Sequence, residues 1–334
     1  MTGHPGPRAE ITVIGEAIVD LVPGDRPRTY HAVPGGSPYN VAIGLARLGH
    51  RTTLMARLGD NAFGRLLREH ARAEGIGLAA APRAAEPATL AVVSLDAAAQ
   101  ASYDFYVEGT ADWQWTAEEI RRAPAGTGVL HFGSLASWTP PGNARILELA
   151  EQLRDRGDVL VSYDPNVRPG LLAGHGHSRR MIERAVRLAH LVKASSDDVA
   201  WLYPGQRPDE VARHWLRLGA TVVVITGSAD GADAFTAHGP AVHRPARDIT
   251  VVDTVGAGDS FTAGLIGSLI GRDQHAPSAL ARCPADQLAG ALDDAILVAS
   301  INCERRGNDP PTAADVAAGR DRLKPRPSPA GDAG

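Results

Sequence analysis

The stretch DTVGAGDSFTAG at 253–264 combines a glycine-rich turn, a carboxylate and the start of an apolar helical pattern. Gly256 and Gly258 allow backbone conformations and close approaches that a side chain would forbid. Their position predicts several N–H groups converging at a helix N-terminus, where unpaired donors and the helix dipole bind phosphate or a developing anion. Asp259 would lie in the first turn of that helix, where a carboxylate can accept a proton from an attacking hydroxyl. The segment therefore indicates phosphoryl-transfer chemistry with Asp259 as the base.

Two other interpretations of GAGD stay open from this segment alone. One is a glycine-rich turn in which the aspartate caps a helix. The other is a dinucleotide-binding fingerprint, which is weak because the third glycine of G-x-G-x-x-G is missing and the segment lies near the C-terminus. The sequence has no GxxxxGK[ST] loop, so we do not expect a Walker-type nucleotide site.

A second glycine-rich segment, GGSPYN, precedes another helical pattern. Ser37 suits an N-cap and Pro38 suits the first helical position. Gly35 and Gly36 would then lie just before a helix N-terminus, where the backbone can touch a ligand. Asn40 falls in the first turn and offers both a donor and an acceptor, either to a ligand or to a local turn.

Further polar side chains stand beside predicted strands. Asp20 in GEAIVDLVP lies between apolar residues, so it needs partners or solvent, and two vicinal hydroxyls of a ligand would satisfy it. The alternative is an exposed charge on a strand. Asp164, Asn166 and Arg168 in DPNVR follow the apolar run VLVSY, and ligands of parallel sheets bind beyond such strand ends. Arg168 could pair with a phosphate or carboxylate of a ligand, or form a structural ion pair.

The elements that must position these residues alternate along the chain. Short, β-branched, apolar runs predict strands buried on both faces of a sheet, at 11–15, 128–132, 159–163, 190–194 and 221–226. Helical patterns lie between them, at 37–48, 61–73, 142–156, 178–189, 208–218, 257–270 and about 286–304. This alternation predicts an α/β fold, a three-layer sandwich with a mostly parallel central sheet.

Two stretches depart from the alternation. Residues 17–33 and 88–107 contain short alternating pieces with no helix between them, which favours a small β-sheet lid outside the sandwich. The alternative is two extra edge strands of the main sheet. We expect one domain over 9–323, with residues 1–8 and 324–334 as flexible tails rich in Pro, Gly and small polar residues.

Composition excludes several classes of protein. The chain has 334 residues, of which 44% are hydrophobic, and a formal net charge of −4. We find no basic patch for nucleic acid, and neither a polybasic stretch nor a long apolar run for a membrane. The only cysteines, Cys283 and Cys303, lack metal-ligand spacing, so a reduced, cytoplasmic setting fits best. We expect Cys303 to be a small core residue.

At this point the sequence resembles a family. DTVGAGDSFTAG and GGSPYNVAIGLARLG resemble the two signatures of the ribokinase (PfkB) family of carbohydrate kinases, in the family's order, and DPNVR and the ending ASINCERRGNDPPT resemble its fructokinase-like branch. The resemblance implies a ribokinase-like fold and an ATP-dependent, Mg²⁺-requiring kinase acting on a primary hydroxyl of a small sugar. It also implies two groups of residues, an anion hole and a sugar site. The anion hole comprises the amides of Ala257, Gly258 and Asp259 beside Gly256; the sugar site comprises Asp20, Gly35, Gly36, Asn40, Asn166 and Arg168.

The resemblance also locates a nucleotide end. Lys193 and Ser195 fall where many members carry an N-x-x-E motif tied to Mg²⁺ and phosphate, but here the motif reads Ser195-x-x-Asp198. Asp198 could still serve Mg²⁺, which prefers oxygen ligands; helix capping by Ser195 or Ser196 is the alternative. Asp253 falls where many members hold a monovalent cation, which allows a role for K⁺.

The stretch ITGSADGA falls where the family has T-x-G-x-x-G around the ATP phosphates. Thr226 and Gly231 match this motif, while Ser228 replaces a glycine, and a plain β-turn is the alternative.

We expect a ketohexose such as fructose as the substrate. Ribose, 2-keto-3-deoxygluconate or a nucleoside are alternatives, as is a regulator of the same fold that binds sugar or nucleotide without catalysis. The resemblance also allows a homodimer formed through the lid.

Overall fold

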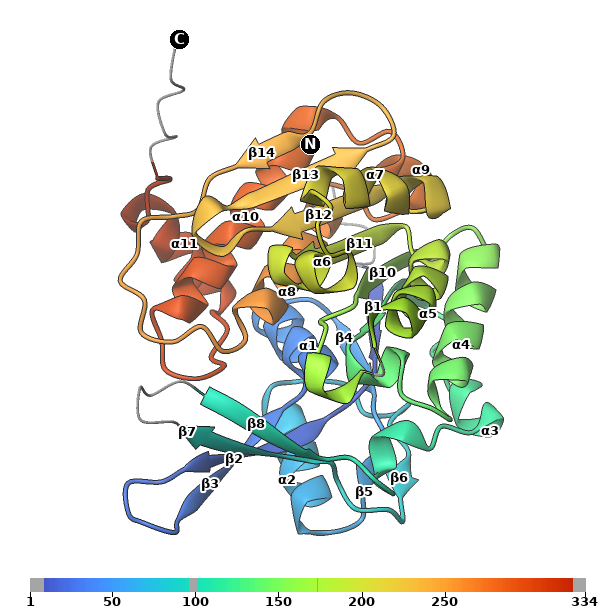
Figure 1. Cartoon of the computed structure of the whole chain (residues 1–334), viewed down its shortest axis with the longest axis vertical. Helices are drawn as coiled ribbons and strands as arrows, with labels where there is room; N and C mark the ends of the chain where they lie inside the picture. Colours follow the sequence, from blue (N-terminus) through green and yellow to red (C-terminus); the bar gives the residue numbers. More distant parts are fainter. Residues whose placement is uncertain (1–8, 96–100, 173, 327–334) are drawn as a thin grey trace, which may run out of the picture.

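The computed structural model describes residues 9–95, 101–172 and 174–326, and its main feature is an eight-stranded sheet (Figure 1). The strands β4, β1, β9, β10, β11 and β12 run parallel, and β13 and β14 continue the sheet in antiparallel fashion. In spatial order they are β4 (Thr52–Met55), β1 (Glu10–Ile14), β9 (Thr127–Gly133), β10 (Leu160–Asp164), β11 (Leu191–Ser195), β12 (Val222–Thr226), β13 (Ala232–Thr236) and β14 (Val242–Arg244).

Helices cover both faces of this sheet, because its strands are apolar on both sides. One buried cluster joins the sheet to α1, α2, α8 and α10, and a second joins the other face to α4, α5, α6 and α7. The helices are α1 (Ser37–Arg47), α2 (Ala62–Ala73), α3 (Ala117–Ile120), α4 (Asn143–Asp155), α5 (His175–Leu188), α6 (Ser196–Leu202), α7 (Pro208–Leu218), α8 (Ala257–Gly271), α9 (Pro277–Leu280), α10 (Ala285–Cys303) and α11 (Ala313–Arg322). The predicted three-layer α/β sandwich with a mostly parallel sheet is confirmed.

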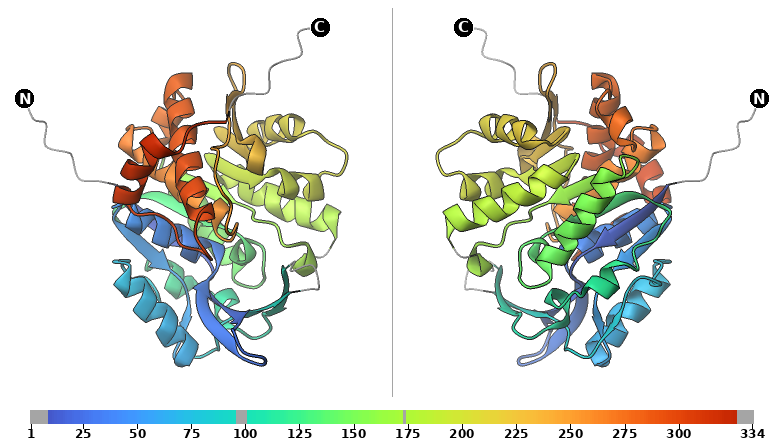
Figure 2. Two further views of the ribbon diagram at one scale, coloured as in Figure 1. Left: turned by 90° about the vertical axis from the view of Figure 1, so that its left-hand side faces the viewer. Right: turned by 90° about the vertical axis from the view of Figure 1, so that its right-hand side faces the viewer.

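A second, separate sheet lies below the sandwich in the views of Figures 1 and 2. Its order is β3 (Tyr30–Gly35), β2 (Ile18–Pro23), β7 (Leu90–Leu95) and β8 (Ala101–Tyr106). β2 pairs with β3 and β7 with β8 in antiparallel fashion, while β2 and β7 are parallel. These strands are the two stretches that break the βα alternation, so the alternative of extra edge strands in the main sheet is wrong. We call this sheet the lid sheet.

The strand register shows which side chains share a face of the lid sheet. Side chains that pair across neighbouring strands lie on the same face of a sheet. Asp20 pairs with Val33 on β3 and with Ala91 on β7, and Ala91 pairs with Phe105 on β8. The face that carries Asp20 therefore also carries Val33 and Phe105.

Several elements depart from the sequence expectations. The short strands β4, β13 and β14 and the helices α9 and α11 were not predicted, and α5 begins three residues earlier than expected. Two stretches outside the expected elements form a two-stranded sheet, β5 (Leu58–Gly59) and β6 (Arg83–Ala84).

The two ends of the chain can be compared with the expected tails only in part. Residues 1–8 and 327–334 lie outside the described residues. Residues 324–326 are described and pair with 246–248, so the flexible tail does not begin at 324 as expected. None of the helices in the described part of the chain has the length and apolar character of a membrane span.

Candidate active site

The N-terminus of α8 lies at the centre of the site. Gly256 is its N-cap, with a φ of 73°, and a Cβ there would collide with the side chain of Asn308. This left-handed conformation and the close approach explain why the turn needs glycine. The amide of Ala257 donates to Thr254 O at 3.2 Å. The amides of Gly258 and Asp259 have no acceptor among the residues that the structure describes, so they are free to bind an anion.

Asp259, in the first turn of α8, is held by two side chains from α1. Ser37 Oγ donates to Asp259 Oδ1 at 2.6 Å, and Asn40 Nδ2 donates to Asp259 Oδ2 at 2.8 Å. Burial raises the pKa of Asp259 above its ordinary value, while the bonds from Ser37 and Asn40 and the charge of Lys193 offset part of this rise. Gly256, not Asp259, is the N-cap of α8, so the capping alternative for this aspartate is wrong.

The start of α1 differs by one residue from the expectation. Gly36, with a φ of 101°, is the N-cap, Ser37 is the first helical residue and Pro38 the second. Ser37 is therefore not an N-cap, and its hydroxyl turns toward Asp259 instead. Asn40 keeps a buried Oδ1 without a protein partner in the described part of the chain, which leaves one acceptor for a ligand.

Asp20 lies on the lid sheet and faces this site. Gly35 lies directly beside it on β3, since a Cβ on Gly35 would collide with the Asp20 carboxylate. Burial raises the pKa of Asp20 to about 6; the charge of Arg168 lowers it and the charge of Asp259 raises it further. Tyr103 of β8 is close enough for Asp20 and Arg168 to influence its pKa, which is raised above its usual value chiefly by burial. The lid sheet thus brings a carboxylate and a tyrosine toward the end of β10.

DPNVR, which follows β10, supplies a buried ion pair. Lys193 Nζ of β11 lies 2.9 Å from Asp164 Oδ2, and both side chains are buried. The same ammonium group lies 3.1 Å from where a Cβ on Gly258 would be, so it borders the free amides of α8. Burial opposes the charge of Lys193, but Asp164 and Asp198 outweigh that effect and its pKa is raised. A permanent positive charge therefore adjoins the anion site.

Asn166 and Arg168 follow β10 in the chain and line one cavity together with Lys193. Asn166 has a φ of 40°, and its side chain donates to Ser134 Oγ at 3.0 Å. Arg168 is exposed, with one nitrogen bonded to Val167 O at 3.0 Å. No carboxylate of the described residues forms an ion pair with Arg168, so the alternative of a structural ion pair has no support there.

Ser195 and Asp198 form a capping box at the start of α6. Ser195 Oγ accepts from the Asp198 amide at 3.0 Å, and Asp198 Oδ2 accepts from the Ser195 amide at 2.9 Å. The other oxygen, Asp198 Oδ1, accepts from Val167 N at 2.8 Å. The capping alternative for Ser195 is therefore confirmed, and the two oxygens of Asp198 already have backbone donors.

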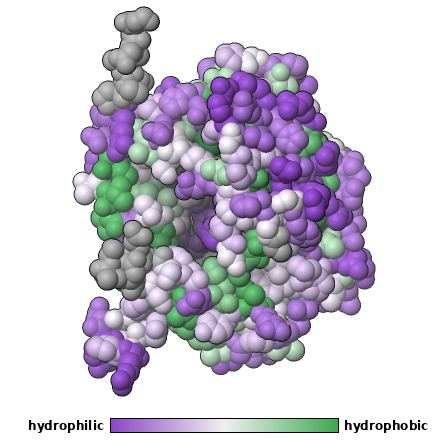
Figure 3. Space-filling model, in the orientation of Figure 1, coloured by the Kyte–Doolittle hydropathy of each residue, from purple (hydrophilic) through white to green (hydrophobic). Residues whose placement is uncertain are grey.

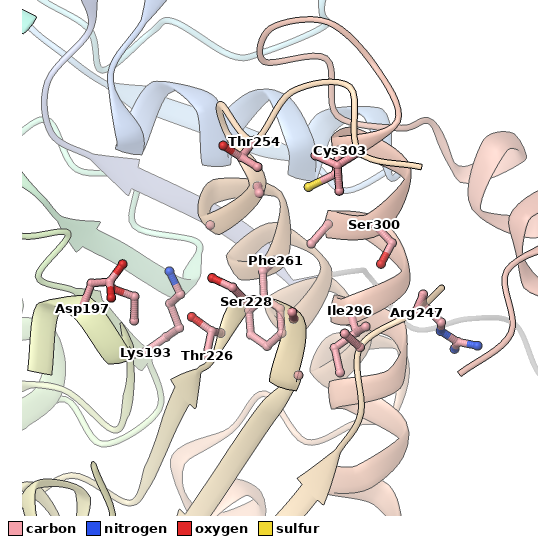
Figure 4. A pocket seen from close by; sticks show the side chains of 18 of the residues that line it. Lys193, Asp197, Thr226, Ser228, Arg247, Thr254, Phe261, Ile296, Ser300 and Cys303 are labelled. Atoms are coloured by element: carbon pink, nitrogen blue, oxygen red, sulfur yellow. The ribbon is translucent and has the colours of Figure 1, made fainter. Parts of the chain in front are cut away.

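A cavity of about 630 Å³ extends from this ion pair toward α10. Figure 4 shows Lys193 and Asp197 at one end, Thr226 and Ser228 next to them, and Ile296, Ser300 and Arg247 at the far end. Figure 3 shows the same face of the molecule hollowed near its centre, above the lid sheet.

The wall formed by the turn after β12 has unusual backbone angles. Ser228 has a φ of 52° and Gly231 a φ of 96°, and a Cβ on Gly231 would collide with Arg244 O. Ser228 thus adopts a left-handed conformation that glycine tolerates best. Apolar side chains also line the cavity, among them Ile249, Phe261 and Ile296.

Comparison with known proteins decides the family. A family model described as pfkB family carbohydrate kinase matches residues 8–314. The chain belongs to this family. It is a phosphotransferase that acts on a carbohydrate hydroxyl, and the expected ribokinase-like fold is confirmed.

Individual relatives of the family extend over most of the chain. It is similar to a fructokinase of Rhizobium leguminosarum bv. trifolii, at 35% identity over 78% of this chain and 79% of the relative. It is also similar to an aminoimidazole riboside kinase of Salmonella typhimurium (strain LT2), at 32% identity over 78% of this chain and 81% of the relative. Among solved structures, a fructokinase of Vibrio cholerae O395 with fructose, ADP and calcium bound superposes with a TM-score of 0.82, at 26% identity, covering 93% of this chain and 98% of that one.

Several residues of this kinase site were not identified from the sequence. Ser37 was interpreted only as a helix cap, and Asp164 only as a residue near a site, without its ion pair to Lys193. Cys303 lines the cavity and is half-buried, so its assignment to the core is wrong. The sequence offered two signals for these contacts, the SPYN segment and the lysine Lys193 within an apolar strand. Neither signal identifies its partner, because the partners are distant in the sequence.

Asp253 has a defined position beside the anion site. Its Oδ1 accepts from Val255 N at 3.0 Å and its Oδ2 from Gly307 N at 2.8 Å. The carboxylate therefore joins the loop before α8 to the loop after α10. Both loops border the cavity, since Thr254 and Cys303 line it.

Proposed function

We propose that this kinase transfers the γ-phosphate of ATP to a primary hydroxyl of fructose. The observation that carries the proposal is Asp259, which is oriented by Ser37 and Asn40 beside two free amides of α8. The names of its relatives support the choice of sugar, since three of them, at 32–35% identity, are fructokinases.

The sugar lies, in this proposal, between the lid sheet and α1. Asp20 accepts hydrogen bonds from sugar hydroxyls, and Gly35 and Gly36 let the backbone approach the ring. Asn40 offers its unpartnered Oδ1, while Asn166 and Arg168 close the site from the end of β10. Neutral hydroxyls suit this mixture of donors and acceptors.

Asp259 then accepts the proton of the attacking hydroxyl as the oxygen bonds to phosphorus and the bond to the β-phosphate oxygen breaks. The amides of Ala257, Gly258 and Asp259 surround the transferred phosphoryl group, with Gly258 and Asp259 as the free donors. Lys193 adds a fixed charge beside it, and the sugar is oriented for in-line attack.

The ATP phosphates lie, in this proposal, along Lys193, Ser195 and the turn with Thr226, Ser228 and Gly231. Mg²⁺ supplies charge neutralisation on the phosphates when it is bound. Within the described residues no group of three or more His, Cys, Asp or Glu side chains could hold a metal ion. This arrangement does not fit a magnesium site in which the protein supplies all the ligands. It fits an ion held mainly by phosphates and water with few carboxylates. Asp197, exposed and lining the cavity, is better placed for this than Asp198, whose oxygens face backbone amides.

We also propose that K⁺ raises the activity through the loop that Asp253 holds. The ion would shape the backbone around the anion site without joining the chemistry. A fructokinase variant of Vibrio cholerae O395 was solved with fructose, ADP and potassium bound, which supports this idea. A titration of kcat with KCl, at constant ionic strength in an otherwise K⁺-free buffer, should rise and saturate; a flat titration contradicts it.

The lid sheet would close over the sugar and could also join two copies of the chain. Val22, Val33 and Tyr103 are exposed on its substrate-facing side, at 36%, 40% and 42%. Three apolar side chains on one sheet face favour burial against a partner. We therefore propose a homodimer through the lid sheet, in a cytoplasmic setting that keeps both cysteines free. Sedimentation of Val33→Lys should show a shift to monomer relative to wild type.

An ATP-consumption screen tests the proposed function. Fructose should give the highest kcat/KM among fructose, ribose, 2-keto-3-deoxygluconate and aminoimidazole riboside. A much higher kcat/KM on one of the other three would assign the enzyme to that substrate instead. ADP binding without turnover on any of them would favour the non-catalytic alternative.

A further inference from the structure

The chain beyond α11 returns across the wall of the nucleotide cavity. Asp248 N donates to Lys324 O at 3.2 Å and Arg326 N donates to Ala246 O at 2.8 Å, which forms an antiparallel bridge. Arg247 donates from its side chain to Leu323 O at 2.9 Å. We call residues 324–326 the strap.

The strap carries Arg326 to the turn that borders the cavity. Its guanidinium donates to Ala229 O at 3.4 Å, and both Ala229 and Arg326 line the cavity. Because its backbone bonds to Ala246, this side chain spans from the segment at 246–248 to the turn at 228–230. Arg326 is half-buried, so the strap holds it in place.

The charge of Arg326 is not neutralised by the protein. No carboxylate within the described residues forms an ion pair with Arg326 or with Arg247, the second guanidinium of this wall. A guanidinium has five donors, and the only side-chain bond of Arg326 among the described residues uses a backbone carbonyl. Donors therefore remain for an anion in the cavity.

The position of this charge along the cavity indicates which part of a nucleotide it meets. Lys193 marks the end next to α8, and Arg247 and Ile296 mark the far end (Figure 4). Ser228, next to Ala229 in sequence, lies between these ends. A nucleotide with its terminal phosphate at α8 and its base at α10 would pass the turn with its phosphate chain.

We propose that Arg326 binds the phosphate chain of the nucleotide, and that the strap exists to position it. The inference rests on the proposed function, which puts ATP in this cavity. The family model ends at residue 314, so Arg326 belongs to a part of the chain beyond the matched region. Arg–phosphate hydrogen bonds are charge-assisted and directional, which suits this role.

Calorimetric titration of ADP and of adenosine into full-length variants tests the proposal. Arg326→Ala should raise the Kd of ADP by about tenfold, the scale of one hydrogen bond to a charged group, and leave the Kd of adenosine within about twofold. Arg326→Lys should lie between Arg326→Ala and wild type, since it keeps the charge but loses the planar fork. Lys324→Ala is the matched control, because Lys324 is an exposed cation that contributes only its carbonyl to the bridge.

Three outcomes distinguish the ideas. Unchanged ADP affinity in Arg326→Ala overturns the assignment of Arg326. An equal loss for adenosine and ADP also overturns it, because the strap would then act only by shaping the cavity. Wild-type protein that binds no ADP would instead refute the proposed function itself.

Discussion

Asp259 meets two opposing demands within one carboxylate. It must be ionised to accept a proton, but burial raises its pKa and disfavours the charge. Ser37, Asn40 and Lys193 act in the other direction and keep the anion available. A base whose pKa lies above that of a solvated aspartate holds a proton more readily, which suits general-base catalysis near neutral pH.

Asp259→Asn should remove most of the turnover and leave the fold intact. Loss of a general base typically costs roughly 10²–10⁴ in rate. The midpoint of thermal unfolding should stay level or rise, since a buried charge with a raised pKa opposes folding at neutral pH. Both kcat and the thermal midpoint should be measured, with Asp286→Asn as control, because Asp286 is an exposed acid in the first turn of α10. A kcat within about tenfold of wild type would rule out Asp259 as the base.

Ser37→Ala should move the acid limb of the kcat profile to higher pH. The bond from Ser37 Oγ lowers the pKa of Asp259, so its removal raises that pKa and more alkaline solution is needed to ionise the base. At high pH kcat should return to within about tenfold of wild type, a difference of about 1.4 kcal/mol in the barrier. Ser260→Ala is the control, since the buried Ser260 hydroxyl has no protein partner among the described residues. An unshifted acid limb in Ser37→Ala would contradict this role.

At the residue scale, the sequence identifies those site residues whose position depends on the local spacing of residues along the chain. Asp259 and Asn40 could be predicted as site residues because each lies in the first turn of a helix that follows a glycine-rich segment. Ser37 could not, because a serine before proline at a helix start is typical of an N-cap, and its actual partner lies 222 residues away. The pairing of Lys193 with Asp164 is likewise a product of neighbouring parallel strands.

At the scale of single elements, the turn after β12 carries a conformational cost. Ser228 occupies the left-handed region, with a φ of 52°, at the position where the sequence resemblance leads us to expect glycine. For an L-residue this region costs roughly 1–2 kcal/mol. Replacing the residue by glycine removes this cost, but the greater freedom of glycine in the unfolded chain lowers the gain in stability by about 0.5–1 kcal/mol.

Ser228→Gly should therefore stabilise the protein by about 0.5–1 kcal/mol. Urea unfolding should show a higher midpoint with an unchanged slope. Ala229→Gly is the matched control in the same turn, and since Ala229 has no positive φ it should lower the midpoint. If the midpoint falls by equal amounts in both variants, the backbone of Ser228 is not under strain.

Strands and helices were predictable to the extent that burial left a periodic pattern. β12 is buried along VVVI and reads clearly as a strand, as do β10 and β11. β4 was missed because TTLM is short and half polar, although all four residues are buried. α11 was missed because its segment AADVAAGRDR buries only Val316 and Gly319, so its apolar stripe is narrow.

At the scale of the whole molecule, the two sheets are joined by buried carboxyl groups. β1 belongs to the large sheet and β2 to the lid sheet, and Glu16 lies between them, fully buried. Glu16 Oε2 accepts from Ala136 N at 3.0 Å. Asp112 accepts from Ala17 N at 2.9 Å and from Thr89 Oγ1 at 2.6 Å, which connects the same junction to the start of β7. No local pattern in the sequence predicts such a junction, because it depends on how the lid sheet docks.

The junction should make stability depend on pH, and Glu16→Gln tests this. Burial raises the pKa of Glu16 from 4.5 to about 7, so the folded protein binds this proton more tightly than the unfolded chain does. The stabilisation from the protonated form is complete below pH 4.5 and is lost as pH rises through about 7. At about 1.4 kcal/mol per pKa unit, wild type should lose on the order of 3 kcal/mol relative to Glu16→Gln between pH 4.5 and 8.

Urea unfolding of wild type and Glu16→Gln across this pH range measures the difference. Glutamine cannot ionise, so the free energies of unfolding of the two proteins should diverge as pH rises, with the variant gaining. Glu69→Gln is the control: it is an exposed substitution on α2, away from the lid junction, and its free energy of unfolding should follow that of wild type at every pH. Parallel curves for Glu16→Gln and wild type would mean that Glu16 ionises as easily in the fold as in water and contributes nothing to the pH dependence of stability.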